Sequence, residues 1–126
     1  MSEERAPWVL IVDRRLGTLL SLDGLLSRNG YRVTTSSSSA EALEEVASRK
    51  PDLVISGRSG PEPSVDLVSR IKALSPETSV LLFVESDDDS MIAAAIAAGA
   101  DGLLRRSYSD RQILRRVEQL LPVAQT

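Results

Sequence analysis

Three short groups of polar residues carry the side chains with which this chain could do chemistry. They are Asp13-Arg14-Arg15, the loop 57–60 with the sequence Gly-Arg-Ser-Gly, and Arg106. Carboxylates hold divalent cations, whereas arginines and glycine-rich backbone bind phosphate and other anions. The loop 57–60 lacks the Gly-Lys-Ser/Thr ending of a nucleotide-binding P-loop, so it does not indicate an NTPase.

Histidine and cysteine are both absent from the 126 residues. Without imidazole or thiol, the chain has no Cys/His zinc site, no Ser-His-Asp or Cys-His nucleophile and no disulfide. Any reaction would therefore rest on carboxylates, hydroxyls, lysine or arginine.

The charge and composition exclude further classes of function. Lys and Arg number 15 against 18 Asp and Glu, for a net charge of −3, and only four side chains are aromatic. Such a chain is not expected to bind nucleic acid or anionic lipid. No apolar run approaches the ~18 residues of a membrane span, and the first residues do not resemble a secretory signal, so a cytoplasmic protein is expected.

Apolar runs rich in β-branched residues alternate with segments of helical periodicity. Strands are expected at residues 8–12, 31–35, 53–56, 80–84 and 102–104. The first helical segment carries periodic leucines, and the second opens with a capping-box spacing at residues 38–41. Apolar positions expected on the helices include Leu16, Leu19, Leu20, Leu22, Leu25 and Leu26 in the first, and Ala40, Leu43, Val46 and Ala47 in the second.

This alternation predicts an α/β fold with a five-stranded parallel, doubly wound sheet of flavodoxin-like order 2-1-3-4-5. We expect a single domain over residues 8–121, a flexible N-terminus at 1–7, and a C-terminal tail or the start of a linker at 122–126. Ligands of such sheets bind beyond the carboxyl ends of the strands. The three polar groups all follow strands, so this edge should bring them together.

At this edge the sequence resembles the receiver domain of bacterial two-component response regulators, the CheY-like proteins of phosphorelay signal transduction. The matching stretches are residues 9–13, 30–33, 40–43, 51–56, 71–72 and 97–102. The resemblance implies a domain in which an acidic pair holds Mg²⁺ and an aspartate accepts a phosphoryl group. It also implies a hydroxyl and a lysine that contact the phosphoryl oxygens.

Carried over residue by residue, this family site is degenerate. Asp13 keeps the first acidic position, but Arg14 takes the second, Gly57 takes the acceptor position, Val84 replaces the hydroxyl and Arg106 replaces the lysine. Gly57 has no side chain with which to attack, and Arg14 would repel a divalent ion by several kcal/mol. We therefore predict a pseudo-receiver with no catalytic residue, no metal and no cofactor, which is not an enzyme.

The predicted function is signalling through contact with a protein partner. One alternative is a receiver phosphorylated at a displaced acceptor, namely Asp13, Ser56 or Ser59. The other is an anion-binding or small-ligand-binding module.

Two interpretations of the arginines at this edge decide the second alternative. In the first, Arg14, Arg58 and Arg106 converge on an anion. In the second, Arg106 bridges Asp13 or Glu85 while Arg58 is solvated, and Asp13 pairs with Arg14 or Arg106. We favour the ion pair, because unpaired charges are seldom buried.

A third set of arginines, Arg111, Arg115 and Arg116, lies on the last expected helix. In the resembled family the corresponding face mediates dimerisation, so these residues are a candidate partner surface and a homodimer is considered. The alternative is a solvated amphipathic face.

Overall fold

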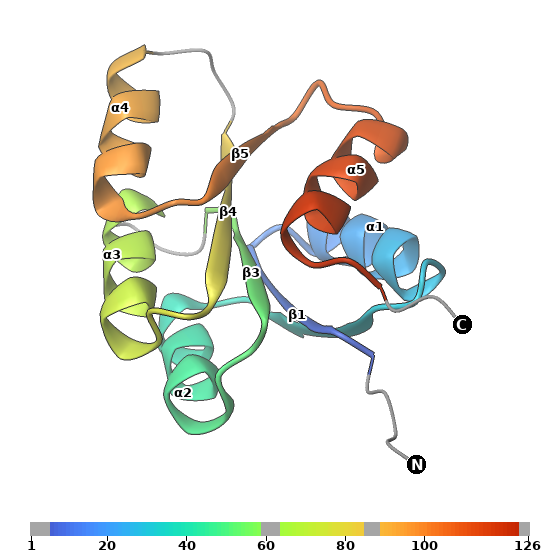
Figure 1. The fold of residues 1–126 in the computed structure, drawn as a ribbon, viewed down its shortest axis with the longest axis horizontal. Helices are drawn as coiled ribbons and strands as arrows, with labels where there is room; N and C mark the ends of the chain where they lie inside the picture. Colours follow the sequence, from blue (N-terminus) through green and yellow to red (C-terminus); the bar gives the residue numbers. More distant parts are fainter. Residues whose placement is uncertain (1–5, 59–63, 85–88, 124–126) are drawn as a thin grey trace.

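The computed structural model describes residues 6–58, 64–84 and 89–123, in which strands and helices alternate along the chain (Figure 1). The strands are β1 (Trp8–Val12), β2 (Arg32–Ser36), β3 (Leu53–Ser56), β4 (Ser79–Val84) and β5 (Gly102–Arg105). The helices are α1 (Leu16–Ser27), α2 (Ser39–Arg49), α3 (Ser64–Leu74), α4 (Asp89–Ala98) and α5 (Asp110–Leu120).

The strands form one parallel sheet in the order β2-β1-β3-β4-β5, which confirms the predicted fold. Every residue of β1 is buried, as expected for a strand covered on both faces. The strand β2 lies at the edge, and only its last residue, Ser36, is buried. The order reverses between β1 and β3, so the crevice of this fold lies beyond those two strands.

Helices cover both faces of the sheet (Figure 1). On one face α1 and α5 enclose a core that includes Leu26, Ile55 and Val117. On the other face α2, α3 and α4 enclose a second core that includes Val46 and Ile71. These side chains are at most 1% exposed, and burial of one aliphatic side chain contributes about 1.5–3 kcal/mol. The two cores fix the loops at the carboxyl edge of the sheet.

The cap predicted at residues 38–41 forms through its serine, and two other helix ends also carry capping residues. Ser38 caps α2 by accepting a hydrogen bond from Glu41 N at 3.2 Å. At the start of α5, Ser109 and Gln112 form both bonds of a capping box. Beyond α4, Gly99 has a φ of 107°, a conformation that glycine adopts without strain.

The phase of two helices differs from the prediction. In α2, Ala42 and Val46 are buried, whereas Ala40 and Ala47 are exposed. Alanines lie on several sides of this helix, so their spacing does not identify the side that packs against the sheet. In α1, the leucines at 19, 22, 25 and 26 are buried, but Leu16 and Leu20 are exposed. The helix has leucines on more sides than the sheet can cover.

Tyr31 begins no strand, contrary to the prediction. Its N–H donates to Leu26 O at 3.1 Å, so its backbone belongs to the turn that ends α1. Its hydroxyl donates to Leu121 O at 2.6 Å and thereby joins this turn to the end of α5. Burial, reinforced by the negative charge of Glu118, raises the pKa of Tyr31 to about 12.

The predicted domain limits stay a prediction, because residues 1–5 and 124–126 lie outside the described part of the chain. Within that part, none of the helices is both long and apolar enough to cross a membrane.

Candidate functional site

Asp13 and Gly57 meet beyond the carboxyl ends of β1 and β3. The N–H of Gly57 donates to Val12 O at 2.7 Å, and the N–H of Asp13 donates to Ser36 O at 3.1 Å. The parallel hydrogen-bonding pattern thus continues one residue past the strands on both sides of β1. Both residues are buried, and Asp13 is only 1% exposed.

Both oxygens of the Asp13 carboxylate have partners within the protein. Oδ1 accepts from the backbone N–H of Arg15 at 2.8 Å, which closes the turn into α1. Oδ2 pairs with Nη2 of Arg106 at 3.3 Å. Arg106 therefore forms an ion pair, as in the interpretation that we favoured from the sequence.

The Asp13 side chain lies where a side chain at position 57 would be. A Cβ added to Gly57 would lie 2.9 Å from Cγ of Asp13 and still closer to its Oδ2. Atoms that are not bonded do not approach so closely, so any other residue at position 57 would displace this carboxylate. Asp13 can therefore keep this orientation only because residue 57 has no side chain.

Arg106 also contacts Thr18, Phe83 and Val84. Its Nη1 donates to Oγ1 of Thr18 at 2.9 Å, and its guanidinium lies 4.3 Å from the centre of the Phe83 ring. The N–H of Arg106 also donates to Val84 O at 3.3 Å. Sequence reasoning missed Thr18 and Phe83. Only Thr18 had a signal in the sequence, because it is a hydroxyl residue in the first turn of a leucine-rich helix.

Arg14 and Arg58 do not join Arg106 around a common point. Their side chains are exposed, and it is their backbones that meet, since Arg14 N donates to Arg58 O at 2.8 Å. The exposure of Arg14 also lowers the electrostatic penalty for binding a divalent ion below the value predicted from the sequence. Water screens Arg14, so its repulsion of a divalent cation falls to about 2 kcal/mol rather than several, even at close approach.

Two other residues of interest at this edge are buried. Val84 is 2% exposed and packs in the core beneath α3 and α4. Ser56 is fully buried, and its hydroxyl has no hydrogen-bond partner among the described residues. Ser59, the other serine considered as a displaced acceptor, lies outside those residues.

The carboxylates that the structure describes do not gather into a metal site: no three of them lie close enough together. Asp13 is the acidic residue that directly follows β1 at this edge. Both of its oxygens already accept hydrogen bonds.

The third set of arginines lies on α5, the helix that follows β5. Arg111, Arg115 and Arg116 are exposed, and Arg116 donates to the hydroxyl of Tyr108 at 3.3 Å. A pocket of about 380 Å³ lies beside them, between α4, β5 and α5. Its lining includes Ile96, Leu103, Arg105, Tyr108 and Arg116.

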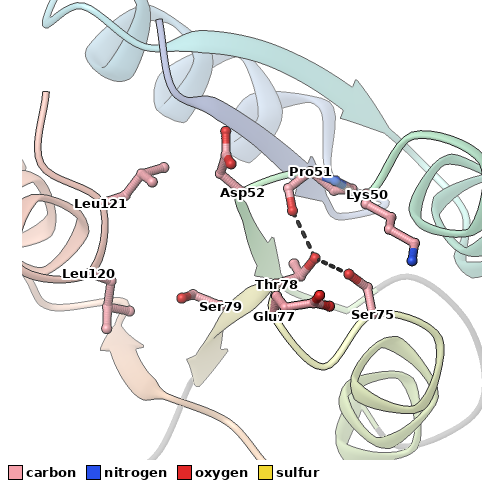
Figure 2. A pocket seen from close by; sticks show the side chains of 9 residues that line it. All are labelled: Lys50, Pro51, Asp52, Ser75, Glu77, Thr78, Ser79, Leu120 and Leu121. Carbon is pink, nitrogen blue, oxygen red and sulfur yellow. Dashed lines mark hydrogen bonds between the residues drawn. The ribbon is translucent and has the colours of Figure 1, made fainter. Parts of the chain in front are cut away.

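A separate pocket of about 320 Å³ lies at the opposite, amino-terminal edge of the sheet, between Leu121 and Lys50 (Figure 2). Its buried hydroxyls satisfy each other, since Thr78 donates to Pro51 O at 2.7 Å and lies 2.7 Å from the hydroxyl of Ser75. This pocket is at the end of the strands away from Asp13, so it is not part of the candidate site.

Comparison with known proteins identifies the family. Residues 9–118 match the response regulator receiver domain. The response regulator MprA of Mycobacterium ulcerans is 29% identical over 114 residues, which are 90% of this chain and 49% of that protein. The chain thus spans about half the length of the curated relatives it matches.

Similar solved structures come from the same family. The signal receiver domain of an HD domain-containing protein from Pseudomonas fluorescens is 32% identical, with a TM-score of 0.86 over 96% of this chain and 90% of that one. A response regulator from Thermotoga maritima is 27% identical, with a TM-score of 0.84 over 92% of this chain and 98% of that one. The chain therefore belongs to the response regulator receiver domain family, the signalling modules of two-component systems.

Proposed function

We propose that this receiver domain does not accept a phosphoryl group, and that it signals by binding another protein in the cytoplasm. The observation that carries this proposal is the position of the Asp13 carboxylate beside Gly57. The acceptor position has no side chain, and the space for one holds a carboxylate already paired with Arg106. On this proposal the domain is a pseudo-receiver and has no enzymatic activity.

The described donors at this edge do not fit Mg²⁺, which needs near-octahedral oxygen coordination and usually one or two free carboxylates. Asp13 supplies one carboxylate, but its oxygens accept from Arg15 N and from Arg106. A metal ion would have to displace Arg106 and leave its guanidinium beside a dication. Arg14 adds a second, weaker repulsion from solvent.

The displaced-acceptor alternative has little support from the geometry. Ser56 is fully buried and cannot meet a phosphodonor without opening of the sheet edge. Asp13 is 1% exposed and is held on both oxygens. The anion-binding alternative is weakened in the same way, because Arg106 is turned toward Asp13 and only Arg14 and Arg58 face solvent.

The exposed arginines of α5 are the surface that we assign to the protein partner. Arg111, Arg115 and Arg116 present positive charge next to an apolar pocket that contains Ile96 and Leu103. This combination suits a partner that presents acidic side chains around an apolar anchor. Neutralising these arginines should slow association and reduce its salt dependence.

Thermal melting in the presence of candidate ligands tests the proposal. Mg²⁺ alone, Mg²⁺ with beryllofluoride, and inorganic phosphate alone should each leave the melting temperature unchanged, because a ligand that binds only the folded state would raise it. A rise with Mg²⁺ and beryllofluoride would support a working receiver. A rise with phosphate alone would support the anion-binding module.

A further inference from the structure

A further pocket lies at the amino-terminal edge of the sheet, next to the pocket of Figure 2. Its volume is about 450 Å³, and Lys50, Asp52 and Leu121 line both pockets. Its lining also includes Arg32, at the start of β2, and Arg49, at the end of α2. Three cations therefore border one pocket in a chain whose net charge is −3.

These cations are not neutralised within the described part of the chain. Arg32, Arg49 and Lys50 are exposed, and the ion pairs found there include none of them. Asp52 also lines the pocket, but its Oδ2 accepts from the backbone N–H of Trp8 at 2.9 Å. The side chains of Asp52 and Lys50 extend in different directions (Figure 2). Among the described lining residues, the cations thus outnumber this carboxylate three to one.

An aromatic ring holds the guanidinium of Arg32 in place. The guanidinium lies 5.1 Å from the centre of the Trp8 ring, which is a cation–π geometry. The indole is 5% exposed, and its Nε1 donates to Oγ1 of Thr34 at 2.9 Å, so the ring itself is fixed. A guanidinium held in this way loses little further freedom on binding a ligand. Its planar fork of N–H donors suits the oxygens of a phosphate group.

Lys50 adopts a backbone conformation that lysine does not favour. It ends α2 with a φ of 54°, and it is the one described residue other than glycine with a positive φ. Glycine or asparagine usually occupies such a position, because a Cβ strains the left-handed conformation. The negative end of α2 accounts for a basic side chain in its last turn, such as Arg49, but not for this strain. Strained residues occur preferentially at functional sites, so we interpret the ammonium group as the reason for a lysine at position 50.

We propose that this pocket binds a ligand that carries a diphosphate group, of which inorganic pyrophosphate is the simplest. Its volume lies within the ~300–1,000 Å³ of small-ligand sites. One phosphate group carries about −1.5 to −2 charges at pH 7, so two linked groups match the three cations better than one does.

The aromatic ring at this site does not extend the recognition to a nucleobase. The Trp8 ring is buried and Arg32 lies over it, so it offers no open face on which a base could stack. The diphosphate of a nucleotide should therefore bind no more tightly than pyrophosphate. The pocket is at the opposite edge of the sheet from Asp13, so this inference does not depend on whether the domain accepts a phosphoryl group.

Isothermal titration calorimetry of the full chain with pyrophosphate, without divalent cations, tests the proposal. We expect a dissociation constant of ~0.01–1 mM at low ionic strength, because contacts with exposed charges are individually weak. Added salt should weaken binding. Orthophosphate should bind at least about tenfold more weakly than pyrophosphate, and ADP no more tightly.

Substitutions in the pocket separate binding from stability. Lys50→Gly should weaken binding at least about tenfold and raise the melting temperature, because it relieves the left-handed strain. Arg49→Gln should also weaken binding. Asp52→Asn should strengthen it, because the change removes a negative charge and the amide oxygen can still accept from Trp8 N. Arg70→Gln is the matched control, since Arg70 is an exposed arginine of α3 outside the lining, and it should leave binding unchanged.

Circular dichroism checks that each variant is folded. Lost binding together with a higher melting temperature in Lys50→Gly would support a lysine that contacts the ligand. Loss of both binding and stability would show that Lys50 has a structural role, and would overturn the proposal. So would equal effects of Arg49→Gln and Arg70→Gln, binding of a glutamate-rich peptide but not of pyrophosphate, or no binding up to about 10 mM pyrophosphate.

Discussion

Gly57→Ala is the substitution that tests the reasoning about the site most sharply. Alanine ordinarily stabilises a protein at a glycine position with ordinary backbone angles, by about 0.4–1 kcal/mol. Here the new Cβ would lie 2.9 Å from Cγ of Asp13 and closer to Oδ2, so the carboxylate must rotate away. Rotation loses the bond from Arg15 N and the pair with Arg106.

The magnitude follows from those two contacts. A hydrogen bond to a charged group contributes about 1.5–3 kcal/mol, and part of the loss is recovered if the rotated carboxylate finds water. We expect Gly57→Ala to lower the free energy of unfolding by about 2–4 kcal/mol. In an Asp13→Ala background only Cβ of residue 13 remains, 3.4 Å from the new methyl group. There Gly57→Ala should be neutral or stabilising.

Urea denaturation of the four chains of this double-mutant cycle measures the coupling, which should be at least about 2 kcal/mol. Gly17→Ala is the control, because its Cβ meets nothing within 4 Å and the substitution should stabilise α1 by about 1 kcal/mol. A Gly57→Ala variant as stable as the parent, or equal effects in the two backgrounds, would refute the account of Asp13.

Two further substitutions test the core. Below pH 10 the hydroxyl of Tyr31 is neutral in both states, so Tyr31→Phe should cost about 1 kcal/mol through the lost bond to Leu121 O. The folded-state pKa of about 12 lies above the ordinary value of 10.0, so the stability that this hydroxyl contributes should disappear between pH 10 and 12. Denaturation at several pH values should show the gap between parent and variant closing, and a constant gap would contradict the raised pKa. Ser56→Ala removes a buried hydroxyl that has no partner among the described residues, so it should raise the free energy of unfolding by about 1 kcal/mol. A loss of stability on urea denaturation would show that the hydroxyl is satisfied.

The sheet was predictable because its signal is local and repeated. The strand β1 is apolar at every position and β2 is not, which places β1 in the centre and β2 at the edge before any contact is known. The right-handed crossover rule then leaves few orders for the remaining strands. The same order places Asp13, Gly57 and Arg106 at one edge of the sheet.

The arrangement at that edge was less predictable. Charge alone predicted that Arg106 pairs with Asp13 or Glu85 without deciding between them. The rotation of the carboxylate into the space beside Gly57 depends on side-chain geometry across two strands. The contacts of Arg106 with Thr18 and Phe83 join residues far apart in the chain. The exposure of Leu16 and Leu20 was missed. Apolar periodicity shows that a helix has a buried face, but it does not show which leucines lie outside that face.

Intact mass after incubation with Mg²⁺ and acetyl phosphate tests the central claim most directly. The account predicts one species with the mass of the unmodified chain, because the acceptor position is Gly57 and the nearby carboxylate of Asp13 is buried and paired. A phosphoryl adduct that depends on Mg²⁺ and maps to Asp13 or to a serine of this edge would contradict it.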